Sequence, residues 1–551
     1  MGSVKENKKD IILTAVFGLF LFLFLFFVLY INFISNPAYY DGDMYADLNL
    51  AKELWKTKSL LPAEWYFGNQ LSVVSTPVLA ALIYGICGKS IIAMAAASSL
   101  MTVFVFAAFD FMLRPYTKMY ARIGGFLIMA AYSAAVLHLA KGIQGWQLFF
   151  TMCSYYAAYL ICAMLSFGCY ARIKSGGNLS KSFWIAAVIA CVLSFGTGMQ
   201  SIRQTEVMVI PMVLFEAVSI ICKKSTRRSA AFTAAVAACN IAGLILIRFL
   251  PFKQHKIFGE TRILPPSKII SELPVFLKNI GKYIICKDYS AGAQAGMFIL
   301  LAVVSAGLIL LIRKSVKEKK LVSFSTLLIL MGIGVAGVAA LDLFTAMNVR
   351  NIYYFMIYPI AGVSAAYLLS SLKGKSLAVT ASAVCICFAA TAGLRFCGIM
   401  KENRAENRAD IYSQVSSFLE DEGYRTIYSD WNIGARIAVA SDDRVQAGLW
   451  RFDINTASSS DQTNVQNELF LPVEYLSIPH IFEKESTQDT AYVIGKDAFT
   501  AVPAAAEKFG ASVNKIAEFS DKKGQTFIVF TSDKPLCSLT YTAKYGKSID
   551  F

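Results

Sequence analysis

Charged side chains are scarce in this 551-residue chain, since Asp, Glu, Lys and Arg make up 16% of it, against about 25% in a typical soluble protein. The chain holds three histidines and no CxxC pair, P-loop, dinucleotide fingerprint or nucleophile elbow. These absences leave no motif for a structural zinc site, a redox dithiol or nucleotide hydrolysis. The energy for a reaction would then come from a bond in the substrate.

The charges that are present divide the chain into two parts. Residues 398–551 hold 16 Lys and Arg against 22 Asp and Glu, a net charge of −6, which leaves +21 on residues 1–397 out of the total of +15. An acidic tail behind a basic, apolar body argues against a nucleic-acid partner. Membrane topology explains the basic charge better.

Long apolar runs dominate the first 400 residues. The first, Ile11 to Ile34, is longer than the apolar region of a signal peptide, about 7–15 residues, so we expect it to remain as a spanning helix. Apolar runs of about 17–25 residues are typical of transmembrane helices. The pattern predicts eleven spans, at residues 11–34, 90–113, 123–140, 148–170, 183–199, 205–222, 229–250, 290–312, 321–346, 350–371 and 376–397.

The apolar segment Leu71–Cys87 decides the topology, because it has only 17 residues and contains Pro77. If this segment crosses the membrane, the basic loops after it fall outside. If it is half-embedded or lies on the surface, those loops fall inside with the N-terminus, and the cytoplasmic segments hold 20 Lys and Arg. The positive-inside rule favours the second arrangement. We therefore expect a multi-pass protein of the plasma membrane with a cytoplasmic N-terminus and an extracytoplasmic tail.

The tail alternates helix and strand signals. We expect helices at Arg408–Glu422 and Asp497–Phe509, each followed by glycine, and short strands at residues 425–429, 444–449, 491–494 and 526–531. The fold class is a polytopic α-helical membrane protein with about eleven spanning helices, a half-embedded helix and a C-terminal extracytoplasmic α/β domain of three layers. The expected boundaries are residues 1–400 for the membrane domain and 401–551 for the α/β domain.

Two carboxylates, Asp41 and Asp43, directly follow the exit of the first span. Charged groups at the edge of a membrane are costly unless they are solvated or used. A carboxylate there can act as a general base or bind a metal. In the plain structural alternative, Asp43 caps a helix over Met44–Lys56 and Asp41 is a turn residue. The spacing alone leaves both interpretations open.

Basic residues on the predicted outer side are candidates for binding an anion. In the third outer loop, Arg203 either binds a phosphate or pairs with Glu206, three residues on. The fourth outer loop, Pro251–Tyr289, carries seven Lys and Arg against three acids. A lipid-linked phosphate or anionic headgroups would explain that excess. The predicted substrate-binding residues are Arg203, Glu206, Lys253, His255, Lys256, Arg262 and Arg350.

The stretch from Asp41 to Ser90 combines an acidic pair directly after the first span, an amphipathic helix (Ala46–Lys58) and a Pro-containing apolar helix that ends in Gly88-Lys89-Ser90. This pattern resembles the glycosyltransferase C superfamily, which includes protein O-mannosyltransferases, lipid A aminoarabinose transferases and oligosaccharyltransferases. The polytopic body and outer tail extend the resemblance over the whole chain. It implies a membrane glycosyltransferase that moves a sugar, with inversion, from a polyprenyl-phosphate carrier to an acceptor on the outer face. It also implies that Asp41 is the catalytic carboxylate, with Asp43 as the second candidate.

Two features depart from that pattern. The second outer loop, Lys141–Gln147, holds no acid, and Ser75-Thr76-Pro77 stands where some relatives carry a Lys/His-Pro-Pro element. A divalent metal, the sugar and the acceptor are therefore left open. Two other functions remain, a transporter or flippase for a lipid-linked glycan and a glycan polymerase or ligase. The transporter would need charged groups in mid-span and internal repeats, and no repeat is evident.

The topology predicts the outcome of reporter fusions. A reporter fused at Asn407 should be active only outside the cytoplasm, and one fused at Lys317 only inside, because basic loops stay on the cytoplasmic side. An active cytoplasmic reporter at Asn407 would reverse the arrangement of every loop discussed above.

Overall fold

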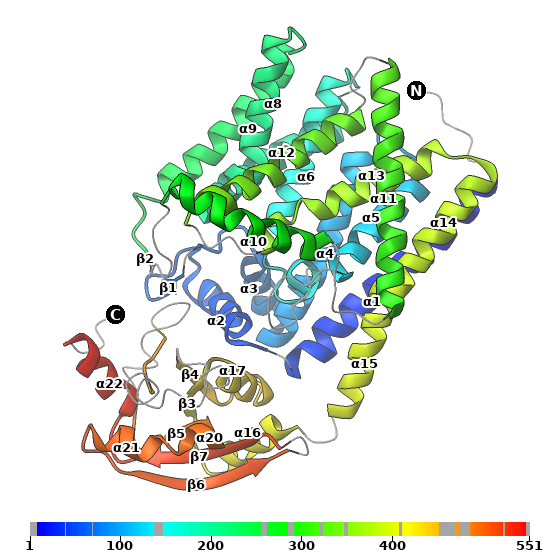
Figure 1. Cartoon of the computed structure of the whole chain (residues 1–551). Helices are drawn as coiled ribbons and strands as arrows, with labels where there is room; N and C mark the ends of the chain where they lie inside the picture. Colours follow the sequence, from blue (N-terminus) through cyan, green and yellow to red (C-terminus); the bar gives the residue numbers. More distant parts are fainter. Residues whose placement is uncertain are drawn as a thin grey trace.

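A bundle of apolar helices with a small sheet domain at one end makes up the computed structural model (Figure 1). The structure describes residues 8–38, 40–68, 70–135, 147–177, 179–254, 262–284, 291–318, 323–346, 351–406, 410–450, 469–473, 485–521 and 524–546. The helical body consists of α1 (Lys8–Tyr30), η1 (Ile31–Ser35), η2 (Asn36–Ala38), α2 (Gly42–Thr57), β1 (Tyr66–Phe67), α3 (Thr76–Cys87), α4 (Ser90–Leu113), α5 (Met119–Ala135), η3 (Gln147–Thr151), α6 (Ala157–Lys174), α7 (Lys181–Gln200), η4 (Thr205–Val209), α8 (Ile210–Ile221), α9 (Arg227–Leu246), β2 (Lys253–Gln254), α10 (Pro266–Ile284), α11 (Ala291–Glu318), α12 (Ser323–Phe344), η5 (Asn351–Tyr354), α13 (Ile357–Ser371), α14 (Gly374–Phe388), η6 (Ala389–Gly393) and α15 (Leu394–Glu406).

Eight helical segments in the described part of the chain are long and apolar enough to cross a membrane. They coincide with eight of the eleven predicted spans. The other three predicted spans contain α5, α6 and α8, of 17, 18 and 12 residues. The predicted end of the α5 span lies outside the described residues, and η3 and η4 interrupt the regular helix ahead of α6 and α8. The count of eleven stays a prediction.

The apolar helix α3 is shorter than a helix that crosses a membrane. Its 12 residues reach about 18 Å at 1.5 Å per residue, against a hydrocarbon core of about 30 Å. Pro77 stands in its first turn, where a missing N–H costs nothing, and Gly88 ends it in the left-handed conformation. The prediction that this segment is not a crossing helix is thus supported by its length.

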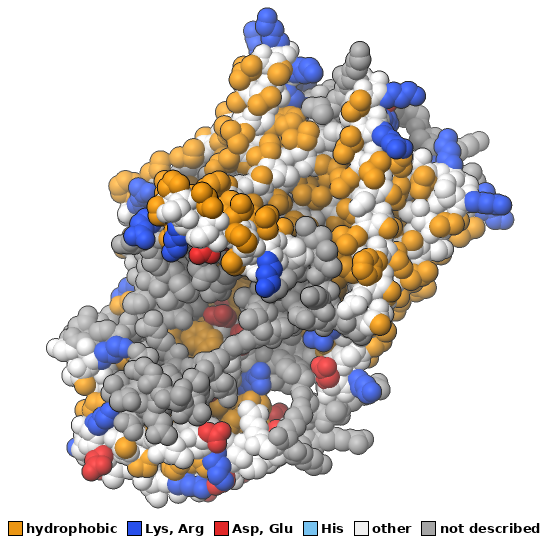
Figure 2. All heavy atoms as spheres, in the orientation of Figure 1, with side chains coloured by type: hydrophobic (Ala, Val, Ile, Leu, Met, Phe, Trp, Pro, Cys, Tyr) orange, Lys and Arg blue, Asp and Glu red, His pale blue; other side chains and the backbone are white. Residues whose placement is uncertain are grey.

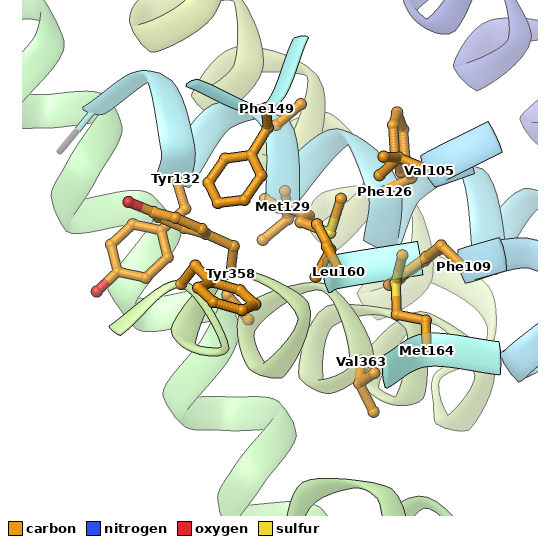
Figure 3. Packing of buried hydrophobic residues seen from close by; sticks show 14 of the residues in the cluster. Val105, Phe109, Phe126, Met129, Tyr132, Phe149, Leu160, Met164, Tyr358 and Val363 are labelled. Atoms are coloured by element: carbon orange, nitrogen blue, oxygen red, sulfur yellow. The ribbon is translucent and has the colours of Figure 1, made fainter. Parts of the chain in front are cut away.

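Aromatic and small side chains hold the helical body together. Tyr358 of α13 meets Tyr132 of α5 and Phe149 of η3 edge to face, with ring centroids 5.6 and 5.5 Å apart (Figure 3). At the α5–α13 crossing, a Cβ built on Gly125 would lie 2.5 Å from the carbonyl oxygen of Gly362. Lipid tails give no hydrophobic drive for helix association, so such close backbone approach is what stabilises the crossing.

Lys and Arg side chains gather at the helix ends that lie away from the sheet domain (Figure 2). They cluster at the tip of the α8–α9 hairpin and at the turn between α13 and α14, and apolar side chains cover much of the helix surface next to these tips. Further Lys and Arg side chains lie in the region of α10 and on the sheet domain. This distribution is the one that the basic loops of the sequence predict for a cytoplasmic face opposite the tail.

A five-stranded mixed sheet forms the centre of the tail. Its strands have the order β4-β3-β5-β7-β6; β4, β3 and β5 are parallel, and β7 and β6 are antiparallel to their neighbours. The elements are α16 (Ile411–Asp421), β3 (Thr426–Asp430), α17 (Trp431–Ala440), β4 (Gln446–Trp450), β5 (Thr490–Gly495), α20 (Lys496–Phe499), α21 (Val502–Glu507), β6 (Val513–Ser520), β7 (Thr526–Ser532) and α22 (Leu536–Tyr545).

Alternate strand residues serve the two faces of this sheet, so the tail has the three layers expected from the sequence. Ile427 and Val493 pack with α16 and α17 on the face toward the helical body. Tyr428 and Tyr492 pack with α21 and α22 on the other face. The four predicted strands are confirmed, whereas β6, α17 and α22 were not predicted.

The tail is joined to the helical body through α2. The Asp443 carboxylate, just after α17, accepts hydrogen bonds from Lys52 Nζ of α2 at 3.0 Å and from Ser90 Oγ of α4 at 2.7 Å. The hydroxyl of Tyr45 accepts a bond from the Ala447 amide at 3.2 Å. One apolar cluster runs continuously from Met44 and Leu48 of α2 into the tail. The tail is therefore docked by both apolar and charged contacts.

Asp443→Asn should loosen this junction. The change keeps a residue that tolerates the left-handed backbone of position 443 (φ 63°) but removes the charge. Hydrogen bonds to charged groups are worth about 1.5–3 kcal/mol, so amide exchange in α17 should accelerate about tenfold or more. Asp442→Asn is the matched control, since Asp442 is also left-handed (φ 53°) but exposed. Equal exchange rates in the two variants would show that the ion pair does not hold the tail.

Candidate functional site

Two asparagines fix the chain where the first helix leaves the body. Asn32 Nδ2 donates to Ser99 Oγ at 3.0 Å and to the Phe150 carbonyl at 3.2 Å, and Asn36 Nδ2 donates to the Thr151 carbonyl at 3.3 Å. A polar side chain in an apolar body is costly unless its hydrogen bonds are satisfied. These bonds set the direction in which the chain enters the acidic turn that follows.

Asp41 is the N-cap of α2. Its Oδ1 accepts a hydrogen bond from the Met44 amide at 2.9 Å, and the helix begins at Gly42. The structural alternative, in which Asp43 caps this helix and Asp41 only makes a turn, is wrong about the cap, because the helix starts two residues earlier. Asp43 instead lies exposed in the first helical turn. A carboxylate has several lone pairs, so capping does not exhaust the acceptor capacity of Asp41.

The carboxylates of this turn lie in a poorly solvated place. Burial raises the pKa of Asp41 above its usual value, and the Met44 amide and then the charge of Arg436 oppose that rise. Burial also raises the pKa of Asp47, one turn further into α2, well above its usual value, and the charges of Asp43 and Asp41 add to this effect. A carboxyl with a raised pKa is suited to accept a proton near neutral pH.

Segments far apart in the sequence form the walls around this turn. Cys153, just before α6, lies with its sulfur 4.0 Å from the Met44 carbonyl oxygen, and both Cys153 and Tyr155 interact electrostatically with the carboxylates of α2. From the tail, the indole of Trp431 covers Gly42 so closely that a Cβ there would lie 2.2 Å from the ring. Gly42 is therefore needed for close packing.

Arg203 is held by two side-chain hydrogen bonds. Its Nη1 donates to Gln70 Oε1 and its Nη2 to the Tyr353 hydroxyl, both at 2.7 Å. The guanidinium lies 4.4 Å from the centre of the Tyr353 ring and 5.7 Å from that of Tyr156. Its described hydrogen bonds thus go to Gln70 and Tyr353, and its relation to Glu206 is one of nearby charge. A cation held by neutral partners keeps its full charge for a ligand.

An apolar cavity of about 290 Å³ opens among α5, α10, α11, α12 and α13. Its lining is almost entirely apolar and includes Tyr132, Ile280, Leu300 and Tyr354. Tyr354 also donates from its hydroxyl to Asp342 Oδ2 at 2.8 Å. Because Tyr353 binds Arg203 and Tyr354 lines the cavity, consecutive residues of η5 connect the cation to the apolar space.

Two predicted residues of the fourth outer loop, Lys253 and Arg262, have described contacts with neighbours other than Arg203. Lys253 Nζ is 3.7 Å from Glu64 Oε2 and stands over the Tyr66 ring at 5.2 Å. Arg262 is exposed, and its carbonyl accepts from the Ala346 amide at 2.7 Å. Three other predicted ligands, His255, Lys256 and Arg350, fall outside the described residues. Residues 266–284 of the loop form α10, which exposes Ile270, Leu273 and Leu277, as expected of an amphipathic helix at a membrane surface.

The local sequence does not mark several residues around the site as functional. Gln70, Tyr156 and Tyr353 are ordinary loop and helix residues until the fold brings them to Arg203. Trp431 and Arg436 belong to a helix that the sequence did not predict. In the described part of the chain, no three His, Cys, Asp or Glu side chains converge as metal ligands.

The architecture is similar over almost its whole length to that of solved structures. In particular, it is similar to apo ArnT, a lipid A aminoarabinose transferase from Cupriavidus metallidurans, over 95% of this chain and 99% of that chain, at 10% identity and a TM-score of 0.51. ArnT bound to undecaprenyl phosphate is similar over 93% of this chain and 98% of that chain, at 10% identity and a TM-score of 0.49. No protein-family model and no curated protein matches the sequence. The predicted resemblance is thus confirmed at the level of the fold.

The contact between Gly42 and Trp431 can be tested by compensation. Gly42→Ala should destabilise the docked tail by about 1–3 kcal/mol through overpacking. Trp431→Ala should remove that penalty, so the double variant should melt higher than the two single effects predict. Gly18→Ala in α1, where a Cβ meets nothing within 4 Å, is the control. Strict additivity of the two changes would contradict the contact.

Proposed function

We propose that this protein is a membrane glycosyltransferase that moves a sugar from a polyprenyl-phosphate carrier to an acceptor on the outer face of the membrane, with inversion. In this proposal, the N-terminus is cytoplasmic and the tail is extracytoplasmic. Residues 1–400 act as the transferase domain and residues 401–551 as a folded domain that covers the site.

The observation that carries the proposal is the spatial order of three features, which are the acidic turn, the cation Arg203 and the apolar cavity. The carboxylates of the acidic turn interact electrostatically with Tyr155, and the guanidinium of Arg203 lies over the ring of the next residue, Tyr156. Arg203 binds Tyr353, and the next residue, Tyr354, lines the apolar cavity. A carboxylate, a cation and an apolar space thus follow one another, as the acceptor, phosphate and isoprenoid tail of such a reaction require.

The proposed chemistry assigns one role to each feature. The isoprenoid tail lies against the apolar cavity, and Arg203 binds the carrier phosphate through charge-assisted hydrogen bonds. Asp41 takes the proton from an acceptor hydroxyl or amine as its oxygen or nitrogen attacks the anomeric carbon. The bond from that carbon to the phosphate oxygen breaks on the opposite face, and its electron pair leaves with the polyprenyl phosphate. Arg203 then stabilises the charge that develops on the leaving phosphate.

Asp43 is the second candidate for the base, because it is exposed and adjacent. The ionised Asp41 is preferred since its orientation is fixed by the Met44 amide, whereas Asp43 belongs to the accessible side of the first turn. The remaining predicted ligands, Glu206, Lys253, His255, Lys256, Arg262 and Arg350, are proposed to contribute positive or balancing charge around the phosphate.

Asp41→Asn separates chemistry from folding. Asn caps a helix as well as Asp does, so thermal stability and binding of the polyprenyl-phosphate sugar should change little, while transfer should fall by about 10²-fold or more. Arg203→Gln should instead weaken donor binding. Asp442→Asn, an exposed carboxylate in the tail, is the charge-matched control. Turnover within about threefold of the wild type for Asp41→Asn would remove Asp41 from the mechanism.

A further inference from the structure

Asp47 is a buried carboxylate in helix α2, which lies between the helical body and the sheet domain (Figure 1). The residue is only 8% exposed. Within the described part of the chain, no side chain or backbone amide donates a hydrogen bond to its carboxylate, and no cation forms an ion pair with it. A buried carboxylate without such a partner is costly, so Asp47 either carries a proton or binds a group that the chain does not supply.

The first two turns of α2 lead from the protein surface to Asp47. Asp43 is exposed and stands four residues before Asp47, so the two side chains lie on the same face of the helix. Like charges at this spacing destabilise a helix. A positively charged ligand would offset that repulsion, with Asp43 at the entrance and Asp47 one turn further in.

The turn before α6 places a second polar group without a partner against α2. The sulfur of Cys153 lies 4.0 Å from the carbonyl oxygen of Met44, one turn before Asp47. Tyr155 packs against the apolar cluster that contains Met44 and Leu48. The hydroxyl oxygen of Tyr155 is buried and has no hydrogen-bond partner among the described residues. The Tyr155 hydroxyl and the Asp47 carboxylate are thus two buried oxygen groups on adjoining elements.

The backbone of this turn is strained. Cys153 and Ser154 both have left-handed conformations, with φ 49° and 45°, although neither residue is glycine. The hydroxyl of Ser154 donates to the Ser98 carbonyl of α4 at 3.3 Å, which helps to fix the turn. Strained backbone persists where the surrounding structure fixes it, and it is concentrated at ligand-binding sites. Here the strained pair directly precedes Tyr155.

We propose that the acceptor carries an ammonium group, and that this group binds between the Asp47 carboxylate and the Tyr155 hydroxyl. The inference rests on the proposed function, in which Asp41 is the base that activates the acceptor. An ammonium group has three N–H donors and no acceptor, so it suits two oxygen groups without donors of their own. Six residues separate Asp41 from Asp47, about 9 Å of helix. The ammonium and the reacting hydroxyl of the acceptor are therefore separated by a spacer of several bonds.

Transfer to a series of lipid acceptors tests this ammonium site. Each headgroup is an amino alcohol with two to six carbons between nitrogen and oxygen, and each is paired with its N-acetylated, uncharged twin. At the matching spacer, the wild type should prefer the charged acceptor by about tenfold in kcat/KM. Asp47→Asn keeps the shape and should abolish the preference by raising KM for the charged acceptor alone. Tyr155→Phe keeps the ring and should reduce the preference about threefold.

Tyr120→Phe is the matched control, because it removes a tyrosine hydroxyl that donates to the Leu369 carbonyl at 3.5 Å, outside the site. It should leave the preference unchanged. Equal kcat/KM for charged and uncharged acceptors at every spacer would overturn the inference, and so would an equal loss for both in Asp47→Asn. If Asp47→Asn does not fold, the acceptor series and Tyr155→Phe decide.

The donor sugar is the other source of an ammonium group. A preference that follows an amine on the donor sugar, and not on the acceptor, would contradict the assignment to the acceptor. Wild-type protein that transfers to no acceptor would refute the proposed function. Transfer without a charge preference would refute only the ammonium site.

Discussion

The burial of a carboxylate at the end of a membrane helix is the constraint on which the rest of the structure depends. Removing Asp41 from water costs free energy that must be offset by fixed partners. The Met44 amide supplies a hydrogen bond, and the positive end of the α2 helix favours a negative charge at its N-cap. Asn32 and Asn36 hold the chain that leads to it. The tail then closes the remaining side through Trp431 and Arg436.

The same arrangement separates the two charges that the proposed reaction needs. If Asp41 and Arg203 were paired directly, each would neutralise the other, and neither would act on substrate. The segment before α6 lies between them, with Tyr155 toward the carboxylates and Tyr156 toward the guanidinium. Arg203 is held by Gln70 and Tyr353, both neutral. The fold thus gives the proposed base and the proposed phosphate ligand separate partners, and the apolar cavity is lined by the residue next to Tyr353.

The sequence predicted features that depend on local pattern and missed those that depend on contact. Apolar runs located the helices of the body. The basic loops led to the assignment of the segment with Pro77 as non-crossing, and the 12-residue length of α3 agrees with it. The sequence analysis did not predict helix α17 because its ten residues follow β3 without a break, although Asp430 is a recognisable helix cap. The cap of α2 was misplaced because Asp41 and Asp43 are equally good cap residues, and the packing of Trp431 on Gly42 is not visible in the local sequence. No pattern in the sequence around Arg436 indicates that it lies near the turn at Asp41, almost 400 residues earlier in the chain.

The central claim is that a lipid-linked phosphate sugar is the donor. The most direct measurement uses the purified full-length chain in lipid nanodiscs, a panel of polyprenyl-phosphate sugars and a panel of hydroxyl and amine acceptors. Release of polyprenyl phosphate and the anomeric configuration of the product are followed together. The account predicts release that depends on both donor and acceptor, with a product of inverted configuration. A product of retained configuration, or transfer from a nucleotide sugar with no turnover of any polyprenyl-phosphate sugar, would contradict it.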